Sequence, residues 1–505
     1  MTMRQHAVSD DFLRPDSINA FTDALRGAKY NVDAVLERLG EAGQEGLTRN
    51  QTMPALDRLG DATDAQADLI RLFPLQQIVP RSRLAAFLDV PALIEAGVLG
   101  AIGREGIHAD IDVRPYGFTD AAGEWSGWVA ADPIPGMDSI VTRTRPNYVL
   151  GVSPASTSLA QLTVPDRVGS ALDLGAGCGV QSLHLARHAD TVTLTDINPR
   201  ALDMARLTLA LNGLDLDVRA GSFYEPVAHD SFDLIVTNPP YVMSPPTDAA
   251  DRLVYREGGF AGDGLVRHVV REGASHLADG GLLQVLANWA DTREASWEDR
   301  LAEWVRGTGC DLWVVEREHL DVYSYIEMWL TDAGLSGDPI WLDRYAEWLN
   351  YFDAQGITGV GLGWIMVRKS GSAEPSVHME SWPYTIAQPV GAALSAGWTA
   401  RDVAGLDDDE LLARTFTVDP SVVQEATGRP GAADPSHVVL RQTAGLCRAL
   451  AVDAAVGGVI GACDGELPLG VLIGAVAGLL DQPVDELEAA ILPRLREAIE
   501  QGFIA

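Results

Sequence analysis

The tetrapeptide Asn238-Pro239-Pro240-Tyr241 carries the sharpest chemical signal in the sequence. It follows directly on the apolar run FDLIVT, which predicts a strand that ends at the tetrapeptide. Two prolines fix the backbone and offer no amide donor, so exposed carbonyls and the side-chain oxygen of Asn238 can accept hydrogen bonds from an NH2 group. Tyr241 can stack on a planar amide or base. The pattern predicts a pocket that holds a planar nitrogen and catalyses by positioning it.

A glycine-rich turn lies upstream, in ALDLGAGCGVQSL. An apolar strand is followed there by Gly175, Gly177 and Gly179 and then by a helix, and glycine lets a backbone bend tightly and approach a ligand closely. The next expected strand, TVTLTD, ends in Asp196, where a carboxylate can accept hydrogen bonds from ribose hydroxyls. The two features indicate a nucleoside-bearing ligand, and NAD would satisfy both equally well.

Short apolar strands alternate with amphipathic helices between Val168 and Ser370, which predicts an α/β domain with a largely parallel sheet. The expected strands begin near Ala171, Thr191, Asp233, Leu282, Asp311 and Val360. We divide the chain into a helical and winged-helix-like domain (1–140), the α/β domain with a helical insertion at about 319–356 (141–372), and an acidic, mainly helical domain (373–505). For the first domain we favour packing against its neighbour over nucleic-acid binding.

The composition of the chain limits the binding partners that we expect, namely nucleic acids, metals and membranes. The 505 residues hold 71 acidic and 37 basic side chains, and a net charge of −34 argues against a generally attractive surface for phosphates. Five arginines near the expected site are interpreted as scattered solvated side chains: Arg143, Arg145, Arg252, Arg256 and Arg267. Cysteines and histidines show no metal-ligand spacing, so no metal is expected. No apolar run reaches the roughly 18 residues of a membrane span, so we expect a cytoplasmic protein without a membrane partner.

Residues 171–288 resemble the class I S-adenosylmethionine-dependent methyltransferases. Within that class they resemble the amino-methyltransferases with an NPPY motif, such as the HemK-like protein-glutamine enzymes and the small-subunit rRNA guanine-N2 enzymes. The matching segments are DLGAGCGVQSL, TDINPRAL, GSFYEP and TNPPYV. The resemblance covers under half of the chain and implies a seven-stranded Rossmann-like sheet with S-adenosylmethionine as the cofactor.

The resemblance also implies a role for each motif residue. The residues implied to bind the cofactor are Asp173, Gly175, Gly177 and Gly179 (methionine part and turn), Asp196 (ribose), Ile197, Ser222 and Phe223 (adenine), and Asn238. The residues implied to bind the target nitrogen are Asn238, Pro239, Pro240 and Tyr241. Ser222 lies at a position where the family often has an acidic residue. Recognition of adenine at this position would then rely on a hydroxyl or a backbone group.

The expected function is methyl transfer to a planar amide or exocyclic amino nitrogen of a macromolecule, either a protein glutamine or an RNA base. The segment GVSPASTSLAQL is similar to the rRNA-type enzymes, whereas YEPV and NPPY are closer to the glutamine-type enzymes. Methylation of DNA adenine N6 and a non-catalytic, cofactor-binding scaffold are the alternatives. The segment LVYREGGFAGDG is either a loop that closes over the substrate or a surface loop that caps the following helix.

Overall fold

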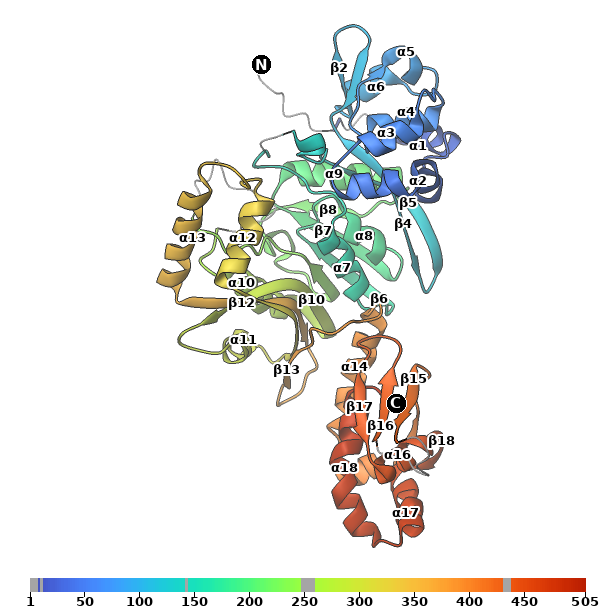
Figure 1. Cartoon of the computed structure of the whole chain (residues 1–505), viewed down its shortest axis with the longest axis vertical. Helices are drawn as coiled ribbons and strands as arrows, with labels where there is room; N and C mark the ends of the chain where they lie inside the picture. The colour runs from blue at the N-terminus through green and yellow to red at the C-terminus, as the bar shows by residue number, and fades with distance from the viewer. Residues whose placement is uncertain (1–7, 10–11, 141–143, 247–258, 430–436) are drawn as a thin grey trace. The chain divides into compact units, whose positions relative to one another are not determined.

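The computed structural model describes residues 8–9, 12–140, 144–246, 259–429 and 437–505 (Figure 1). The chain forms two compact units. The first joins Met1–Ala160 to Arg167–Pro383, and the second joins Gln161–Asp166 to Tyr384–Ala505. The division of the chain at residues 140 and 372 that we expect from the sequence remains a proposal.

An eight-stranded sheet forms the centre of the first unit, in the order β13-β11-β12-β10-β9-β6-β7-β8. Its strands are β6 (Val168–Leu174), β7 (Ala189–Asp196), β8 (Asp217–Ala220), β9 (Phe232–Thr237), β10 (Leu277–Thr292), β11 (Asp311–Asp321), β12 (Ile357–Arg368) and β13 (Val377–Ser381). Strands β6 to β10 run parallel, whereas β12 is antiparallel to both β10 and β11. All six strands expected from the sequence are confirmed, and β13, which pairs with β11, extends the expected seven-stranded sheet by one.

The strand order reverses between β6 and β9, where the chain leaves the two strands in opposite directions along the sheet. In open α/β sheets, ligands bind at the carboxyl ends of the strands beside such a reversal. Helices α10 (Gly264–Gly273) and α11 (Trp297–Val305) form one core with the sheet residues Leu172, Ile235 and Leu283. Helices α8 (Val180–Leu185) and α9 (Pro199–Leu211) belong to a different core, which they share with the N-terminal region.

The N-terminal region contributes helices, a small sheet and a hairpin to the first unit. They are α1 (Pro15–Gly27), α2 (Val32–Thr48), α3 (Met53–Leu59), α4 (Ala65–Leu72), α5 (Arg81–Leu84), α6 (Val90–Glu95), the sheet β1-β3-β2 (Val79–Pro80, Gly106–Ala109, Leu99–Ile102) and the hairpin β4-β5 (Asp112–Asp120, Gly123–Ala131). In Figure 1 this region, in blue, lies against α9. Buried side chains of α1 to α4 and of α8 and α9 form one continuous apolar core.

Polar contacts fasten the hairpin to the same two helices. Asn212, which caps α9, donates its amide to the Trp128 carbonyl (2.7 Å) and accepts the Trp128 N–H (3.0 Å). Phe118 stacks on His184 of α8 with ring centroids 3.8 Å apart, and the Tyr116 hydroxyl lies 2.8 Å from the same imidazole. Burial lowers the pKa of His184 to about 4. The N-terminal region therefore packs against the sheet domain, as favoured from the sequence.

Two helices occupy the insertion between β11 and β12, namely α12 (Val322–Asp332) and α13 (Trp341–Gln355). Tyr325 and Ile326 of α12 are fully buried, and Trp348 and Phe352 of α13 pack with them. Trp341, Tyr345 and Tyr351 of α13 are only partly buried, so the aromatic side chains of this helix are divided between a buried face and a partly exposed one.

The second unit combines helices with two small sheets. Its helices are α14 (Gly391–Ala404), α15 (Asp408–Leu412), α16 (Ala454–Gly461), α17 (Leu469–Leu480) and α18 (Val484–Glu500), and its strands are β14 (Thr415–Thr417), β15 (Val422–Thr427), β16 (His437–Gln442), β17 (Ala449–Val452) and β18 (Asp464–Pro468). β15 and β18 are short and mostly exposed, so they show no apolar alternation from which a strand could be expected. In the described part of the chain, no helix has the length and apolar character needed to cross a membrane.

The shared core predicts that the N-terminal region and the sheet domain are stabilised together. Leu207 of α9 is fully buried in that core. We expect Leu207→Ala to lower the free energy of unfolding by about 2 to 5 kcal/mol and to raise amide exchange in both α1 and β7. Leu342→Ala, at a side chain that is 76% exposed, is the control and should change stability by less than about 0.5 kcal/mol. Faster exchange in β7 alone would contradict a common core.

Candidate active site

Four strand ends are hydrogen-bonded to one another at the carboxyl edge of the sheet. The Thr195 carbonyl at the end of β7 accepts the N–H groups of Gly175 and Ala176, each at 2.9 Å. The Gly221 N–H, after β8, donates to the Asp196 carbonyl at 3.1 Å. The Thr237 hydroxyl at the end of β9 donates to the Leu174 carbonyl of β6 at 2.7 Å. The motif residues expected from the sequence thus lie on loops that leave one continuous edge.

The glycine turn after β6 requires glycine for two different reasons. Gly175, Gly177 and Gly179 have φ values of 74°, 56° and 79°, in the left-handed region that favours glycine. A Cβ on Gly175 or Gly177 would meet nothing within 4 Å, so the space beside them is open to a ligand. A Cβ on Gly179 would lie 3.3 Å from Ala205 of α9, which gives Gly179 a packing role. Its expected cofactor role remains a proposal.

Asp196 supports the glycine turn directly. Its carboxylate accepts the Gly177 N–H at 2.9 Å and the Asn198 N–H at 2.8 Å, one bond on each oxygen. A carboxylate offers about four lone-pair positions, so acceptor capacity remains for further donors. Burial raises the pKa of Asp196, against the lowering effect of these N–H bonds. The neighbouring Ile197 is 60% exposed, an apolar side chain open to a flat partner.

Asp173 is a nearly fully buried carboxyl beside the same turn. Burial raises the pKa of Asp173 to about 7, and the nearby Asp196 adds to this shift, although the Ser182 hydroxyl donates to it at 2.6 Å. A positive group close to a carboxyl favours its ionised form. Asp173 can therefore ionise most easily when a cation lies near it.

The loop after β8 carries a strained aromatic residue. Phe223 has a φ of 46°, which is costly for a residue with a bulky side chain. Its ring meets the edge of His268 at 5.0 Å and of Phe260 at 6.1 Å between centroids, and Phe260 is 44% exposed. The preceding Ser222 donates its backbone N–H to Glu225 at 3.3 Å. The loop thus presents an apolar surface near the expected adenine position.

Asn238 begins the tetrapeptide directly after β9. Its side-chain oxygen is buried and accepts no hydrogen bond from the residues that the structure describes. A buried acceptor without a donor costs about 1 to 3 kcal/mol, which a ligand N–H at this atom would remove. Tyr241 lies edge-on to Trp329, 6.4 Å between centroids, and burial raises its pKa, so the phenol stays neutral at ordinary pH.

Two residues near the tetrapeptide were not found by sequence reasoning. The Tyr325 hydroxyl of α12 accepts the Met243 N–H at 3.0 Å and the Asn288 side-chain N–H at 2.8 Å. Asn288 is fully buried in β10, and its side-chain oxygen accepts no bond from the described residues. An amide within the apolar run LLQVLANW was the available signal.

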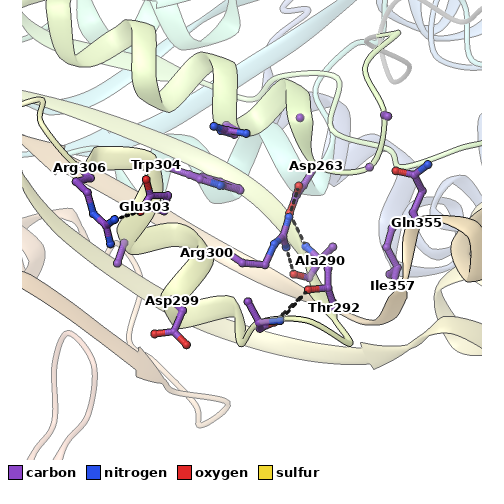
Figure 2. A pocket seen from close by; sticks show the side chains of 16 residues that line it. Asp263, Ala290, Thr292, Asp299, Arg300, Glu303, Trp304, Arg306, Gln355 and Ile357 are labelled. Carbon is purple, nitrogen blue, oxygen red and sulfur yellow. Dashed lines mark hydrogen bonds and ion pairs between the residues drawn. The ribbon is translucent and has the colours of Figure 1, made fainter.

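A cavity of about 700 Å³ lies where α10 begins, beside the end of β10 and the helix α11 (Figure 2). Arg300 crosses it to form a 2.7 Å ion pair with the buried Asp263, which also accepts the Ala290 N–H at 2.9 Å. Arg306 pairs with Glu303 at 2.6 Å. Asp263 and Arg300 are thus paired with each other, as are Glu303 and Arg306.

The arginines noted in the sequence do not form one basic surface in the described structure. Arg145 pairs with the buried Asp132, and Arg267 is an exposed residue that lines the cavity of Figure 2. Arg143, Arg252 and Arg256 lie outside the described residues, as do the first six residues of the segment LVYREGGFAGDG. Among the described residues, no cluster of His, Cys, Asp or Glu could hold a metal ion.

Comparison with known proteins finds family models that match three parts of the chain. A model described as "Methyltransferase small domain" matches residues 151–306. Two domains of unknown function match the flanking regions, DUF7059 at residues 27–110 and DUF7782 at residues 397–505.

Two curated relatives carry the name "Ribosomal RNA small subunit methyltransferase C". The one from Salmonella arizonae is 34% identical over 158 residues, which are 30% of this chain and 41% of the relative. The one from Enterobacter sp. is 34% identical over 185 residues, 36% of this chain and 47% of the relative. The chain thus spans less than half the length of these relatives.

A solved structure of the T. thermophilus 16S rRNA N2 G1207 methyltransferase (RsmC), in complex with AdoMet and guanosine, is also similar. It is 19% identical, and the match covers 45% of this chain and 58% of that one. Its TM-score is 0.25.

Asp173 predicts a pH dependence of stability. Because its pKa is raised in the fold, its contribution to stability is present below pH 4 and is lost as the pH rises to about 7. Asp173→Asn removes this loss because asparagine does not titrate. Relative to the unchanged protein, the free energy of unfolding of the variant should therefore rise by as much as about 4 kcal/mol between pH 4 and 7. Urea unfolding of both proteins across this range measures the difference.

The control is Asp279→Asn, at a fully exposed side chain, which should stay within about 0.5 kcal/mol of the unchanged protein at every pH. A difference for Asp173→Asn that does not vary with pH would contradict the buried carboxyl.

Proposed function

We propose that this chain, whose residues 151–306 are a methyltransferase small domain with S-adenosylmethionine as its cofactor, methylates an exocyclic amino nitrogen of a base in RNA. The observation that carries the proposal is the buried side-chain oxygen of Asn238, which accepts no bond from the described residues. An exocyclic amine supplies the N–H that this oxygen lacks.

The residues at the sheet edge would divide the binding of the cofactor between them. Asp196 has acceptor positions left for the ribose hydroxyls after it has bonded Gly177 and Asn198. Gly175 and Gly177 leave room for close approach of the ligand to the backbone. Asp173 would ionise beside a cationic group of the ligand, since a positive neighbour lowers the pKa of a carboxyl. The exposed Ile197 and the loop at Ser222 and Phe223 fit the flat adenine.

Positioning is the main contribution of the tetrapeptide. The cofactor supplies an electrophilic methyl group. Asn238 accepts an N–H of the target amine, and this bond orients the nitrogen lone pair. Pro239 and Pro240 hold the carbonyls of the loop in a fixed backbone, and the neutral Tyr241 confines the plane of the base. No ionised base is required at this position.

The choice of RNA over other targets follows from the relatives, both of which are named as rRNA enzymes. A protein glutamine offers the same planar NH2 group but lacks this support. The net charge of −34 means that RNA must be held by a local surface rather than by the whole protein. Methylation of DNA adenine and a non-catalytic scaffold role are the alternatives to this proposal. The proposed location is the cytoplasm.

Incubation with labelled S-adenosylmethionine and fractionated cell extract tests the target. We expect label in RNA that is sensitive to ribonuclease and that falls steeply with salt. Label that survives nuclease and migrates with a protein would support a glutamine target instead, and label in DNA would support adenine. Cofactor binding without transfer to any fraction would support the scaffold.

Two variants separate the two halves of the site. Asn238→Ala should lower kcat by about 10²- to 10³-fold and leave the cofactor Kd nearly unchanged, because it removes one positioned partner of the reacting group. Asp196→Ala should chiefly weaken cofactor binding, by about tenfold or more, because it removes charge-assisted acceptors. Calorimetric binding and steady-state rates measure the two effects.

Asp190→Ala, an exposed position at the opposite end of β7, is the control and should change neither quantity. An equal loss of cofactor affinity in Asn238→Ala and Asp196→Ala would contradict the division of roles.

A further inference from the structure

The helical insertion contacts both ends of the chain segment that joins the tetrapeptide to α10. Tyr325 of α12 reaches the first end, at Met243, and Tyr351 of α13 reaches the second end, at Gly262. In both contacts the tyrosine hydroxyl accepts a backbone N–H. Nothing in the matched family model assigns a role to these helices, since it ends at residue 306.

The first contact lies two residues beyond Tyr241. The Met243 N–H donates to the Tyr325 hydroxyl at 3.0 Å, and Asn288 donates to the same oxygen at 2.8 Å. All three side chains are fully buried. Buried N–H groups need an acceptor, so this hydroxyl fixes the position of the backbone that follows the tetrapeptide.

An aromatic contact extends this link to the tetrapeptide itself. Trp329 lies edge-on between Tyr325, at 6.1 Å between centroids, and Tyr241, at 6.4 Å. Edge-to-face pairs of this kind prefer a defined geometry. Helix α12 therefore contacts the ring of Tyr241 through Trp329, in addition to the backbone that follows the tetrapeptide.

The second contact fixes the start of α10. The Gly262 N–H donates to the Tyr351 hydroxyl at 2.7 Å. The next residue, Asp263, is held by the Ala290 N–H and by Arg300, as Figure 2 shows. The beginning of α10 is thus joined to β10, to α11 and to the insertion.

We propose that the helical insertion positions the tetrapeptide and the start of α10, with Tyr325 and Tyr351 as the positioning residues for these two ends of the segment. This inference rests on the proposed function, because the first end adjoins the tetrapeptide that would hold the target nitrogen. Neither tyrosine needs to touch the substrate. Tyr325 acts on Asn238 and Tyr241 through the backbone and through Trp329, and Tyr351 acts through Gly262.

Replacement of each tyrosine by phenylalanine tests the proposal. Tyr325→Phe removes one oxygen and leaves two buried donors without their acceptor. We expect kcat to fall at least tenfold, with the cofactor Kd unchanged, and amide exchange to rise in the peptide that contains Met243. Tyr351→Phe should raise exchange in the peptide that contains Gly262 and lower kcat to a smaller extent.

The matched control is Tyr345→Phe, also in α13. The Tyr345 hydroxyl donates to Glu327 at 3.0 Å on the surface and contacts neither end of the segment. This variant should keep the wild-type kcat and exchange. Far-ultraviolet circular dichroism checks that all three variants are folded, and Tyr351→Phe tests the proposal independently of Tyr325.

Amide exchange is measured without substrate, so it tests the contacts at Met243 and Gly262 even where no methyl transfer is detected. Unchanged exchange at both Met243 and Gly262 would overturn the proposal. Faster exchange in Tyr325→Phe with an unchanged kcat would also overturn it, since the contact would then be structural only. Failure of the proposed function has a different signature, namely no methyl transfer by the unchanged protein.

Discussion

Thr195 and Asp196, the last residues of β7, hold the loops of the two neighbouring strands. The Thr195 carbonyl accepts two N–H groups of the glycine turn, the Asp196 carboxylate accepts a third, and the Asp196 carbonyl accepts the Gly221 N–H after β8. Backbone polar groups at the end of a sheet must find partners, and here they find one another. The shape of this edge of the sheet, where we propose that the cofactor binds, is thus fixed by hydrogen bonds within the protein.

With this arrangement in place, the proposed reaction would need few charged residues. The buried Asp173 and the partly buried Asp196 both have raised pKa values, which would suit a site that receives a positively charged ligand. In the proposed function, the neutral, buried acceptor at Asn238 would select a donor without repelling a base. The tetrapeptide would also have to keep a fixed position, and the buried contacts of Tyr325 with Met243 and Asn288 lie next to it.

The sequence predicts the sheet and the local motifs well because both depend on neighbouring residues. Strands β6, β7 and β9 are apolar runs, and the glycine turn and the tetrapeptide follow them directly. β8 and β13 were missed because DVRA and VHMES are short, contain several polar residues and lie at the two edges of the sheet. The contact of Tyr325 with Met243 joins residues 82 apart in the chain, and that of Asn212 with Trp128 joins residues 84 apart, so no local pattern contains them.

A crystal structure of the protein with S-adenosylhomocysteine and a guanine or adenine nucleoside tests the proposed function most directly. We expect ribose hydroxyls bonded to Asp196, the sulfur facing the open side of the glycine turn, and the exocyclic amine donating to the side-chain oxygen of Asn238. A ligand bound instead in the cavity beside Arg300, or an Asn238 side chain that turns away from the nucleoside, would contradict it.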